Sequence, residues 1–417
     1  MDLAPYDVIG SLAHAQMLRK VGLLTSEELK DMQSSLKGIY AQIQGGSFEI
    51  ESHMEDVHSQ VEWMLTKELG DVGKKIHAGR SRNDQVLVDL RLMFRDDIKE
   101  IVDLQSSLYH LLMSLAEKHK EDLLPGYTHL QAAMPSSFGL WFSAYAENMI
   151  DDLRIWKATF DMINQNPLGS GAGYGTSLPL DRTMTTLLLG FANLDYNVVH
   201  AQMGRSRSEL FLSFALSATA NTLSKLAMDV CLYNSQNFGF IKLADSFTTG
   251  SSIMPHKKNP DVFELVRAKC NTIGQLPGTI AGAFGFLPSG YHRDFQLLKE
   301  QIFPAIKEMK SCLQIVTLAL KNISIEKDIL SDKKYDLTFS VESVNKLVNQ
   351  GVPFRDAYQQ LAKQIADGSY RPDQNLQHTH EGSIGNLCLP EIESKFQSVH
   401  DEFDFSFVNA INILVGS

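Results

Sequence analysis

The sequence predicts a mainly α-helical protein, and three observations support that prediction. Apolar residues recur every three or four positions over long stretches, most clearly at 84–120 and 136–164. Between 205 and 235, apolar and small residues lie on nearly every face, which is typical of a helix buried inside a bundle. The alternation of apolar and polar residues that marks a strand is scarce. A bundle of long helices is therefore the expected core.

The first eighty residues predict shorter helices with clear breaks. Val8 to Leu24 is rich in apolar residues, and Thr25 and Glu28 then have the spacing of a capping box that opens the next helix. Gly45-Gly46 interrupts that helix, and residues 54–69 again carry apolar side chains at helical spacing. This part of the chain predicts a small helical unit.

The long helix near residue 84 begins with a polar segment. Ser81 or Asn83 can cap this helix, and the planar guanidinium of Arg82 suits a carboxylate. Taken alone, these residues also fit an ordinary helix start with a surface arginine. Pro125-Gly126 ends the helix and leaves His129 in a loop, where a structural histidine and a pocket-facing histidine are both open.

A glycine-rich stretch follows the second long helix. Residues 166–179 (NPLGSGAGYGTSLP) contain a GxGxxG-like spacing, but no predicted strand precedes them. A connecting loop is therefore a better interpretation than a dinucleotide site.

Residues 249–264 (TGSSIMPHKKNPDVFE) predict a loop that runs into a helix. The loop concentrates hydroxyls, two lysines, a histidine and an asparagine. Carbanion chemistry needs such a set, because a serine or lysine takes a proton while lysine and asparagine stabilise the negative charge. A basic surface loop that caps a helix is the alternative. Beyond it we expect helices at 262–280 and 296–320, and shorter helices from residue 331 onward.

Composition excludes several classes of protein. The net charge of −11 argues against a nucleic-acid binder, and no apolar run is long enough to span a bilayer. The first residues do not have the pattern of a secretory signal. The four cysteines are far apart in the sequence and predict buried thiols in a reducing cytoplasm.

Four ordered stretches carry a resemblance to a known family. They are HAGRSRNDQV (77–86), GYTHLQAA (126–133), GSSIMPHKKNP (250–260) and LPSGYHRDFQLLKE (287–300). Together they resemble the fumarase/aspartase lyase superfamily, and within it the argininosuccinate lyase family. The resemblance runs from about Asp7 to the C-terminus. Members of that family normally carry a further segment before Asp7, with a substrate-contacting serine, and this sequence begins too late to contain it.

The resemblance implies a three-domain, mostly helical fold with a central long-helix bundle. We expect an N-terminal domain at 1–81, a bundle domain at 82–330 with the active loop 249–264, and a small C-terminal helical domain at 331–417. It also implies a homotetramer in which several subunits contribute to each active site.

The resemblance further implies roles for individual residues. Ser251 is expected to be the base, Lys257 and Asn259 to hold the substrate carboxylate, His129 to protonate the leaving nitrogen, and Glu264 to support His129 or the loop. Other residues are expected to contact the substrate: Ser81, Arg82, Asn83, Thr128, Tyr291, Gln296 and Lys299. Arg205 aligns with a family arginine. Elimination of this kind requires no metal or organic cofactor.

The expected activity is the reversible cleavage of argininosuccinate to arginine and fumarate, a step of arginine biosynthesis, in the cytoplasm. The expected partners are this small-molecule substrate and further copies of the chain, with no nucleic acid and no membrane. Two alternatives remain. One is a sister lyase, such as adenylosuccinate lyase, fumarase or aspartase. The other is a non-catalytic, crystallin-like structural protein, against which the presence of Ser251, Lys257, Asn259 and His129 argues.

Overall fold

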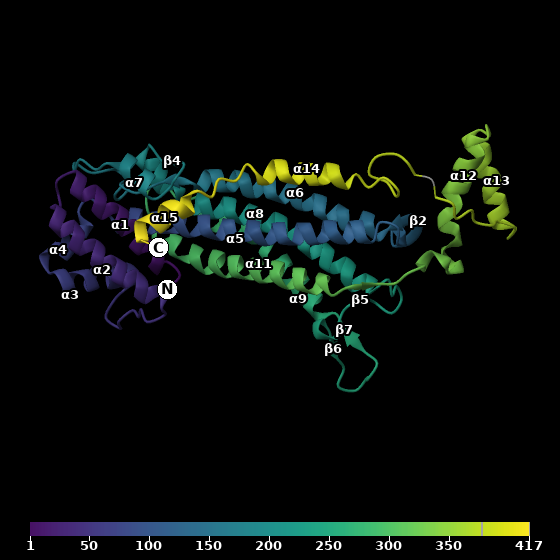
Figure 1. Cartoon of the computed structure of the whole chain (residues 1–417), viewed down its shortest axis with the longest axis horizontal. Coiled ribbons are helices and arrows are strands. Elements are labelled where there is room, and N and C mark those ends of the chain that lie inside the picture. Colours follow the sequence, from purple (N-terminus) through teal and green to yellow (C-terminus); the bar gives the residue numbers. More distant parts are fainter. Residues whose placement is uncertain (377, 417) are drawn as a thin grey trace.

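The structure is a computed structural model that describes residues 1–376 and 378–416. It confirms the mainly helical prediction. Four long helices lie side by side along the long axis of the molecule, as Figure 1 shows: α5 (Arg82–Lys118), α6 (Phe138–Ile163), α8 (Val198–Tyr233) and α11 (Leu298–Lys321). Both chain ends lie near the same end of this bundle, beside the N-terminal helices.

Short helices build the N-terminal end: α1 (Ala4–Lys20), α2 (Ser26–Gln44), α3 (Val57–Leu69), α4 (Asp71–Lys74) and the 3-10 helix η1 (Lys75–His77). The predicted capping box of α2 is present. Thr25 Oγ1 accepts a hydrogen bond from the backbone N–H of Glu28 at 3.2 Å, and Glu28 Oε2 accepts one from the N–H of Thr25 at 2.9 Å. These helices share an apolar core that is separate from the main bundle core. Val88 and Leu92 of α5 also belong to it.

The bundle core is apolar, with a few polar groups that find partners. Trp156 is fully buried and donates its indole N–H to Thr219 Oγ1 at 2.9 Å, which joins α6 to α8. Gln105 of α5 is also fully buried and donates to the carbonyl of Met149 at 2.8 Å. Buried polar groups are costly unless they are hydrogen-bonded, so these contacts favour one register of the helices.

The third long helix differs from the prediction at its start. The sequence predicted a helix from residue 205, whereas α8 begins at Val198 and is interrupted at Arg205 and Ser206. Arg205 has an extended ψ of 143°, and Ser206 has a φ of 63°. The buried Arg205 donates to the carbonyl of Phe295 at 3.2 Å and lies 3.8 Å from Glu209, so the break accompanies a tertiary contact.

The segment around His129 is a hairpin and not the predicted loop. Strands β1 (Leu123–Thr128) and β2 (Gln131–Ser137) pair antiparallel, and His129 and Leu130 form the turn. Both turn residues lie in the left-handed region, with φ of 54° and 58°. Two-residue hairpin turns need this conformation because it matches the strand twist, although glycine and asparagine usually supply it.

The remaining central elements are short. They are β3 (Gln165–Asn166), α7 (Arg182–Leu188), β4 (Asn193–Leu194), β5 (Ile241–Lys242), η2 (Asp245–Phe247), β6 (Thr249–Gly250), β7 (Lys258–Asn259), α9 (Asp261–Ile273), α10 (Leu276–Phe284), η3 (Arg293–Leu297) and β8 (Ser324–Ile325). The single helix expected at 262–280 is divided into α9 and α10. β3 pairs with β4, β5 with β8, and β6 with β7. Across the described residues, every helix is too short or too polar to cross a membrane.

The last part of the chain consists mainly of shorter helices, as expected. It contains η4 (Ile329–Ser331), η5 (Lys333–Phe339), α12 (Ser340–Asn349), α13 (Phe354–Ala366), α14 (Leu389–His400) and α15 (Phe407–Val415). α12 and α13 share a small core at the far end of the bundle, whereas α14 packs along α6 and α15 contacts α1 and α7 (Figure 1). The division into three domains stays a prediction.

Candidate active site

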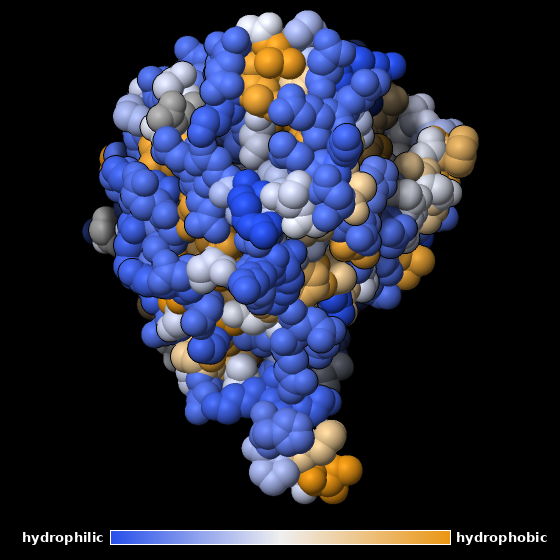
Figure 2. Space-filling view, turned by 90° about the vertical axis from the view of Figure 1, so that its right-hand side faces the viewer, coloured by the Kyte–Doolittle hydropathy of each residue, from blue (hydrophilic) through white to orange (hydrophobic). Residues whose placement is uncertain are grey.

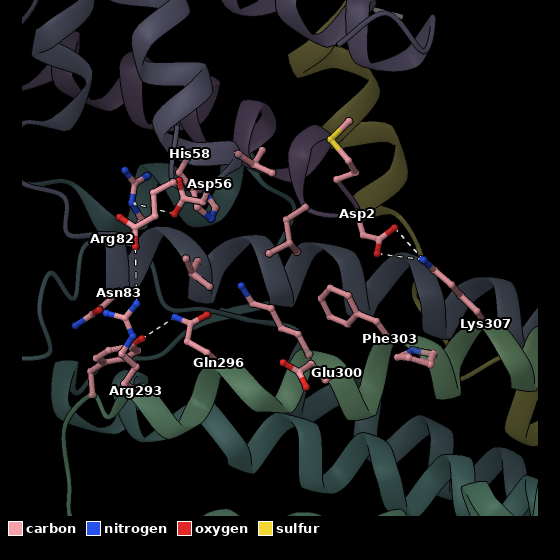
Figure 3. A pocket seen from close by; sticks show the side chains of 18 of the residues that line it. Asp2, Asp56, His58, Arg82, Asn83, Arg293, Gln296, Glu300, Phe303 and Lys307 are labelled. Carbon is pink, nitrogen blue, oxygen red and sulfur yellow. Dashed lines mark hydrogen bonds and ion pairs between the residues drawn. The ribbon is translucent and has the colours of Figure 1, made fainter. Parts of the chain in front are cut away.

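A cavity of about 960 Å³ lies where the start of α5 faces η3 and the start of α11. Five predicted substrate-contacting residues line it: Arg82, Asn83, Tyr291, Gln296 and Lys299. In Figure 3, Arg82 and Asn83 lie on one side and Gln296 lies across from them. Two segments separated by more than two hundred positions therefore meet at one pocket.

The start of α5 is held by a capping box. Ser81 Oγ accepts from the backbone N–H of Asn83 at 3.2 Å, and Asp84 Oδ1 accepts from the N–H of Ser81 at 2.8 Å. The other oxygen of Asp84 accepts from the N–H groups of Gly169 and Gly171, both at 3.0 Å. Burial raises the pKa of Asp84 to about 6, although these hydrogen bonds act in the opposite direction. The glycine-rich stretch is thus a connecting loop that is attached to the helix start.

Arg82 lies at the edge of the pocket with 34% of its side chain exposed. Its Nη1 donates to Gln85 Oε1 at 3.0 Å, and its Nη2 donates to Ser59 Oγ at 3.3 Å. Carboxylates of Asp56 and Glu62 lie 3.8 and 3.9 Å from guanidinium nitrogens. The protein thus holds the guanidinium at several atoms, and such a group can bind a carboxylate in a defined orientation.

The opposite side of the pocket comes from η3 and α11. Gln296 donates its amide N–H to the hydroxyl of Tyr291 at 2.6 Å. Lys299 is half-buried, and its pKa is lowered, mainly by burial and next by the charge of Arg205. Asp89 and Asp56 act in the opposite direction on this pKa. A negatively charged ligand in the pocket would interact favourably with the charges of Lys299 and Arg205.

The loop that contains Ser251 lies between β6 and β7 and projects from the side of the bundle (Figure 1). Ser251 Oγ accepts from the backbone N–H groups of Ile253 at 3.3 Å and Met254 at 3.2 Å. Two N–H donors on one hydroxyl oxygen are the contacts that would stabilise an alkoxide there. Ile253 is 83% exposed, and Figure 2 shows hydrophobic surface at the end of the projection at the bottom.

The other predicted residues of this loop are half-buried or exposed. Asn259 is half-buried and donates to Thr249 Oγ1 at 3.5 Å across the β6–β7 pair. Lys257 and Glu264 are exposed. Asp261 accepts hydrogen bonds from the backbone and the side chain of Thr249, which joins the first turn of α9 to the start of the loop.

Thr128 and His129 are exposed at the β1–β2 turn, at the opposite end of the bundle from the pocket (Figure 1). The 37 residues of α5 separate the two places. At a rise of 1.5 Å per residue, that helix is about 55 Å long. The structure of one chain therefore groups the residues around Arg82 and Lys299, and leaves the Ser251 loop and the His129 turn at two other places.

A buried cluster behind the pocket was not anticipated. His58 Nδ1 lies 3.1 Å from Asp7 Oδ1 and 3.3 Å from Asp89 Oδ2, and Gln85 donates to Asp7. Asp7, His58 and Asp89 come from α1, α3 and α5, so no local sequence pattern links them. They bring three atoms of the kind that ligate metals within 4.8 Å of one another. In this structure the nitrogen of that set lies between the two carboxyl groups and makes its hydrogen bond with Asp7.

The pKa values of the two carboxyl groups in this cluster are shifted in opposite directions. Burial and the charge of Asp7 raise the pKa of Asp89 well above its ordinary value. Burial also acts to raise the pKa of Asp7, but His58, Arg80 and the hydrogen bond from Gln85 outweigh it, and the pKa of Asp7 is lowered. Asp7 therefore ionises more readily than Asp89, which holds its proton more strongly.

Comparisons with known proteins identify the family of the chain. A family model described as lyase matches residues 2–274. The argininosuccinate lyase of Bacteroides thetaiotaomicron is 58% identical over 403 residues, which cover 97% of this chain and 90% of the relative. That of Thermotoga neapolitana is 38% identical over 363 residues, which cover 87% and 91%.

Solved structures with lower identity share the fold. EDDS lyase in complex with formate has a TM-score of 0.84 at 21% identity, with 100% of this chain and 92% of that chain covered. The class II fumarase of Schistosoma mansoni has a TM-score of 0.71 at 16% identity, with 87% of each chain covered. The match to the family model and the identity to the curated relatives extend over most of the sequence, and this chain belongs to the argininosuccinate lyase family.

Proposed function

We propose that the chain cleaves argininosuccinate reversibly into arginine and fumarate, by the β-elimination that its curated relatives are named for. One observation of the structure supports this most strongly. Five residues expected to contact the substrate line one cavity, and Ser81 begins the helix that presents two of them. The cavity carries cations for the carboxylates of the substrate, and acidic residues such as Asp56 and Glu300 for its cationic groups.

The chemistry begins at the carbon next to a carboxylate. In our proposal, ionised Ser251 Oγ removes a proton from that carbon, and Lys257 and Asn259 stabilise the charge that the carboxylate gains. The electron pair then forms the double bond of fumarate while the carbon–nitrogen bond breaks. His129 gives a proton to the departing nitrogen, and Glu264 supports the loop. The N–H groups of Ile253 and Met254 on Ser251 Oγ favour the alkoxide that this role requires.

Acid, base and charge stabilisation are sufficient for this elimination, so we propose no metal or organic cofactor. A cytoplasmic location is part of the same proposal, because all four cysteines are free thiols, as expected in a reducing compartment.

The site we propose is composed of several chains. His129 and Arg82 lie at opposite ends of α5, about 55 Å of helix apart, and no small substrate reaches both within one chain. A second copy aligned antiparallel would place its hairpin beside the pocket of the first. Exposed apolar side chains on the bundle offer a surface for such contacts: Ile155, Phe214, Met228, Leu265 and Leu318. We propose a homotetramer with shared sites.

Fumarate release from argininosuccinate by the purified chain tests the function. We expect steady release by the parent chain, and none by the Ser251→Ala variant with unchanged far-UV circular dichroism. Adenylosuccinate, aspartate and malate, offered in the same assay, test the sister lyases. Turnover of one of these substrates in place of argininosuccinate would overturn the proposal, and ordinary activity of the variant would remove Ser251 from the mechanism.

A further inference from the structure

A chain of hydrogen bonds joins the pocket to the buried cluster behind it. Gln85 lies one helical turn after Arg82 on α5 and is 3% exposed. Its side-chain amide makes two contacts in opposite directions. Nε2 donates to Asp7 Oδ1 at 2.5 Å, and Oε1 accepts from Arg82 Nη1 at 3.0 Å. One glutamine therefore bridges a buried carboxylate and a pocket guanidinium.

The chemistry of the two neighbours determines how this amide is oriented. An ionised carboxylate only accepts hydrogen bonds, so the NH₂ group of Gln85 must face Asp7. A guanidinium only donates, so the carbonyl oxygen must face Arg82. A flipped amide would set oxygen against oxygen on one side and N–H against N–H on the other. The bridge therefore has one orientation, and only a side chain with both a donor and an acceptor can form it.

The far end of the bridge is buried. Asp7 is fully buried on α1, and the oxygen that receives Gln85 also lies 3.1 Å from His58 Nδ1. That nitrogen lies 3.3 Å from Asp89 Oδ2 as well, and Asp89 is fully buried. Three helices thus hold the acceptor of Gln85. By contrast, Arg82 is one-third exposed, and surface arginines usually sample several rotamers.

We propose that Gln85 is a positioning residue, which links the buried Asp7–His58–Asp89 cluster to Arg82 and so holds its guanidinium ready for a substrate carboxylate. The inference rests on the proposed function, since it assigns Arg82 to ground-state binding of a dicarboxylate. Without the bridge, Arg82 keeps its charge and its contact with Ser59, but Nη1 loses its acceptor on Gln85. The carboxylates of Asp56 and Glu62 remain 3.8 and 3.9 Å from other guanidinium nitrogens. The effect of its loss is therefore on affinity and less on the chemical step.

The test is a double-mutant cycle in the assembled enzyme. Gln85→Met keeps the length of the side chain and removes both polar atoms. We expect KM for argininosuccinate and the inhibition constant of fumarate to rise about tenfold, with kcat within about twofold of the parent, because a hydrogen bond to a charged group is lost. In an Arg82→Met background, the same change should raise KM by less than about twofold, because Gln85 Oε1 then has no donor at residue 82 to accept from.

A matched control separates this effect from general loss of packing. Gln105→Met removes an equally buried glutamine from the same helix, whose amide donates to the carbonyl of Met149 in the bundle. It should lower stability and leave KM and the fumarate inhibition constant unchanged. If Gln85→Met fails to assemble, Gln85→Asn keeps an amide against Asp7 but is one methylene too short to reach Arg82 as well, and the same cycle applies.

The outcomes are distinct. An equal rise in KM from Gln85→Met in both backgrounds, or an unchanged KM in a folded variant, would overturn the bridge. Absence of turnover by the parent chain itself would contradict the proposed function instead. In that case, direct binding of fumarate to the parent and to Gln85→Met still decides whether the bridge positions Arg82 for a carboxylate.

Discussion

Activity should return when two inactive variants are combined, because the proposed site takes His129 and Ser251 from different chains. One variant carries His129→Asn and the other carries Ser251→Ala. Each alone is expected to form tetramers without turnover. His129 lies at the turn of β1–β2 and Ser251 lies in the loop that projects from the side of the bundle, and Figure 1 shows the two places well apart.

The size of the recovery follows from counting chains. When the two variants mix randomly in equal amounts, a site needs an intact His129 from one chain and an intact Ser251 from another. Each condition holds for half of the sites, so about a quarter of the sites, and about a quarter of the parent activity, should be restored. If one chain supplied both residues to a site, every site would lack one of them and recovery would be zero.

The assay is fumarate release by mixed tetramers that carry two different affinity tags and are purified on both in succession. A mixture of Ser251→Ala with Lys257→Ala is the control, because one loop supplies both residues and no activity should return. Zero recovery in the doubly purified His129/Ser251 sample would refute the shared-site argument. Recovery of activity in the control would show that Ser251 and Lys257 of one site come from different chains, which contradicts the arrangement assumed in the count.

The remaining predictions concern stability, and each is measured by urea denaturation at one protein concentration. Thr25→Ala should cost about 1 kcal/mol by removing the cap of α2, with activity unchanged. Arg205→Leu should cost about 3–5 kcal/mol, because it leaves Glu209 buried without its ion-pair partner, and Arg205→Leu with Glu209→Leu should recover most of that loss. Burial raises the pKa of Asp152 from 3.8 to about 6, so its destabilising contribution is absent near pH 4, grows as the pH rises through this window, and is complete above it. Asp152→Asn should therefore stabilise the protein by about 3 kcal/mol at pH 7 and have little effect at pH 4, and equal effects at both values would contradict that shift.

The helices could be predicted because their signals are local. Apolar residues three and four positions apart define the buried face of α5 and α6, and Thr25 with Glu28 forms the expected cap of α2. The turn at His129 and Leu130 could not be predicted in this way. A positive φ is uncommon for any residue but glycine, and here two such residues form the turn between the paired strands. The break at Arg205 and Ser206 likewise accompanies a contact with Phe295, almost a hundred positions away.

The sequence alone predicted which residues take part in the chemistry, since the motifs around Arg82, His129, Ser251 and Gln296 are short contiguous patterns. Tertiary structure decided which of them meet. Close packing of α5 against α11 joins Arg82 to Lys299 in one pocket, and the length of α5 keeps His129 away from both. The tertiary structure also places Asp7, His58 and Asp89, from three different helices, behind that pocket. Contacts between distant segments depend on how whole helices pack, and a local pattern holds no information about that packing.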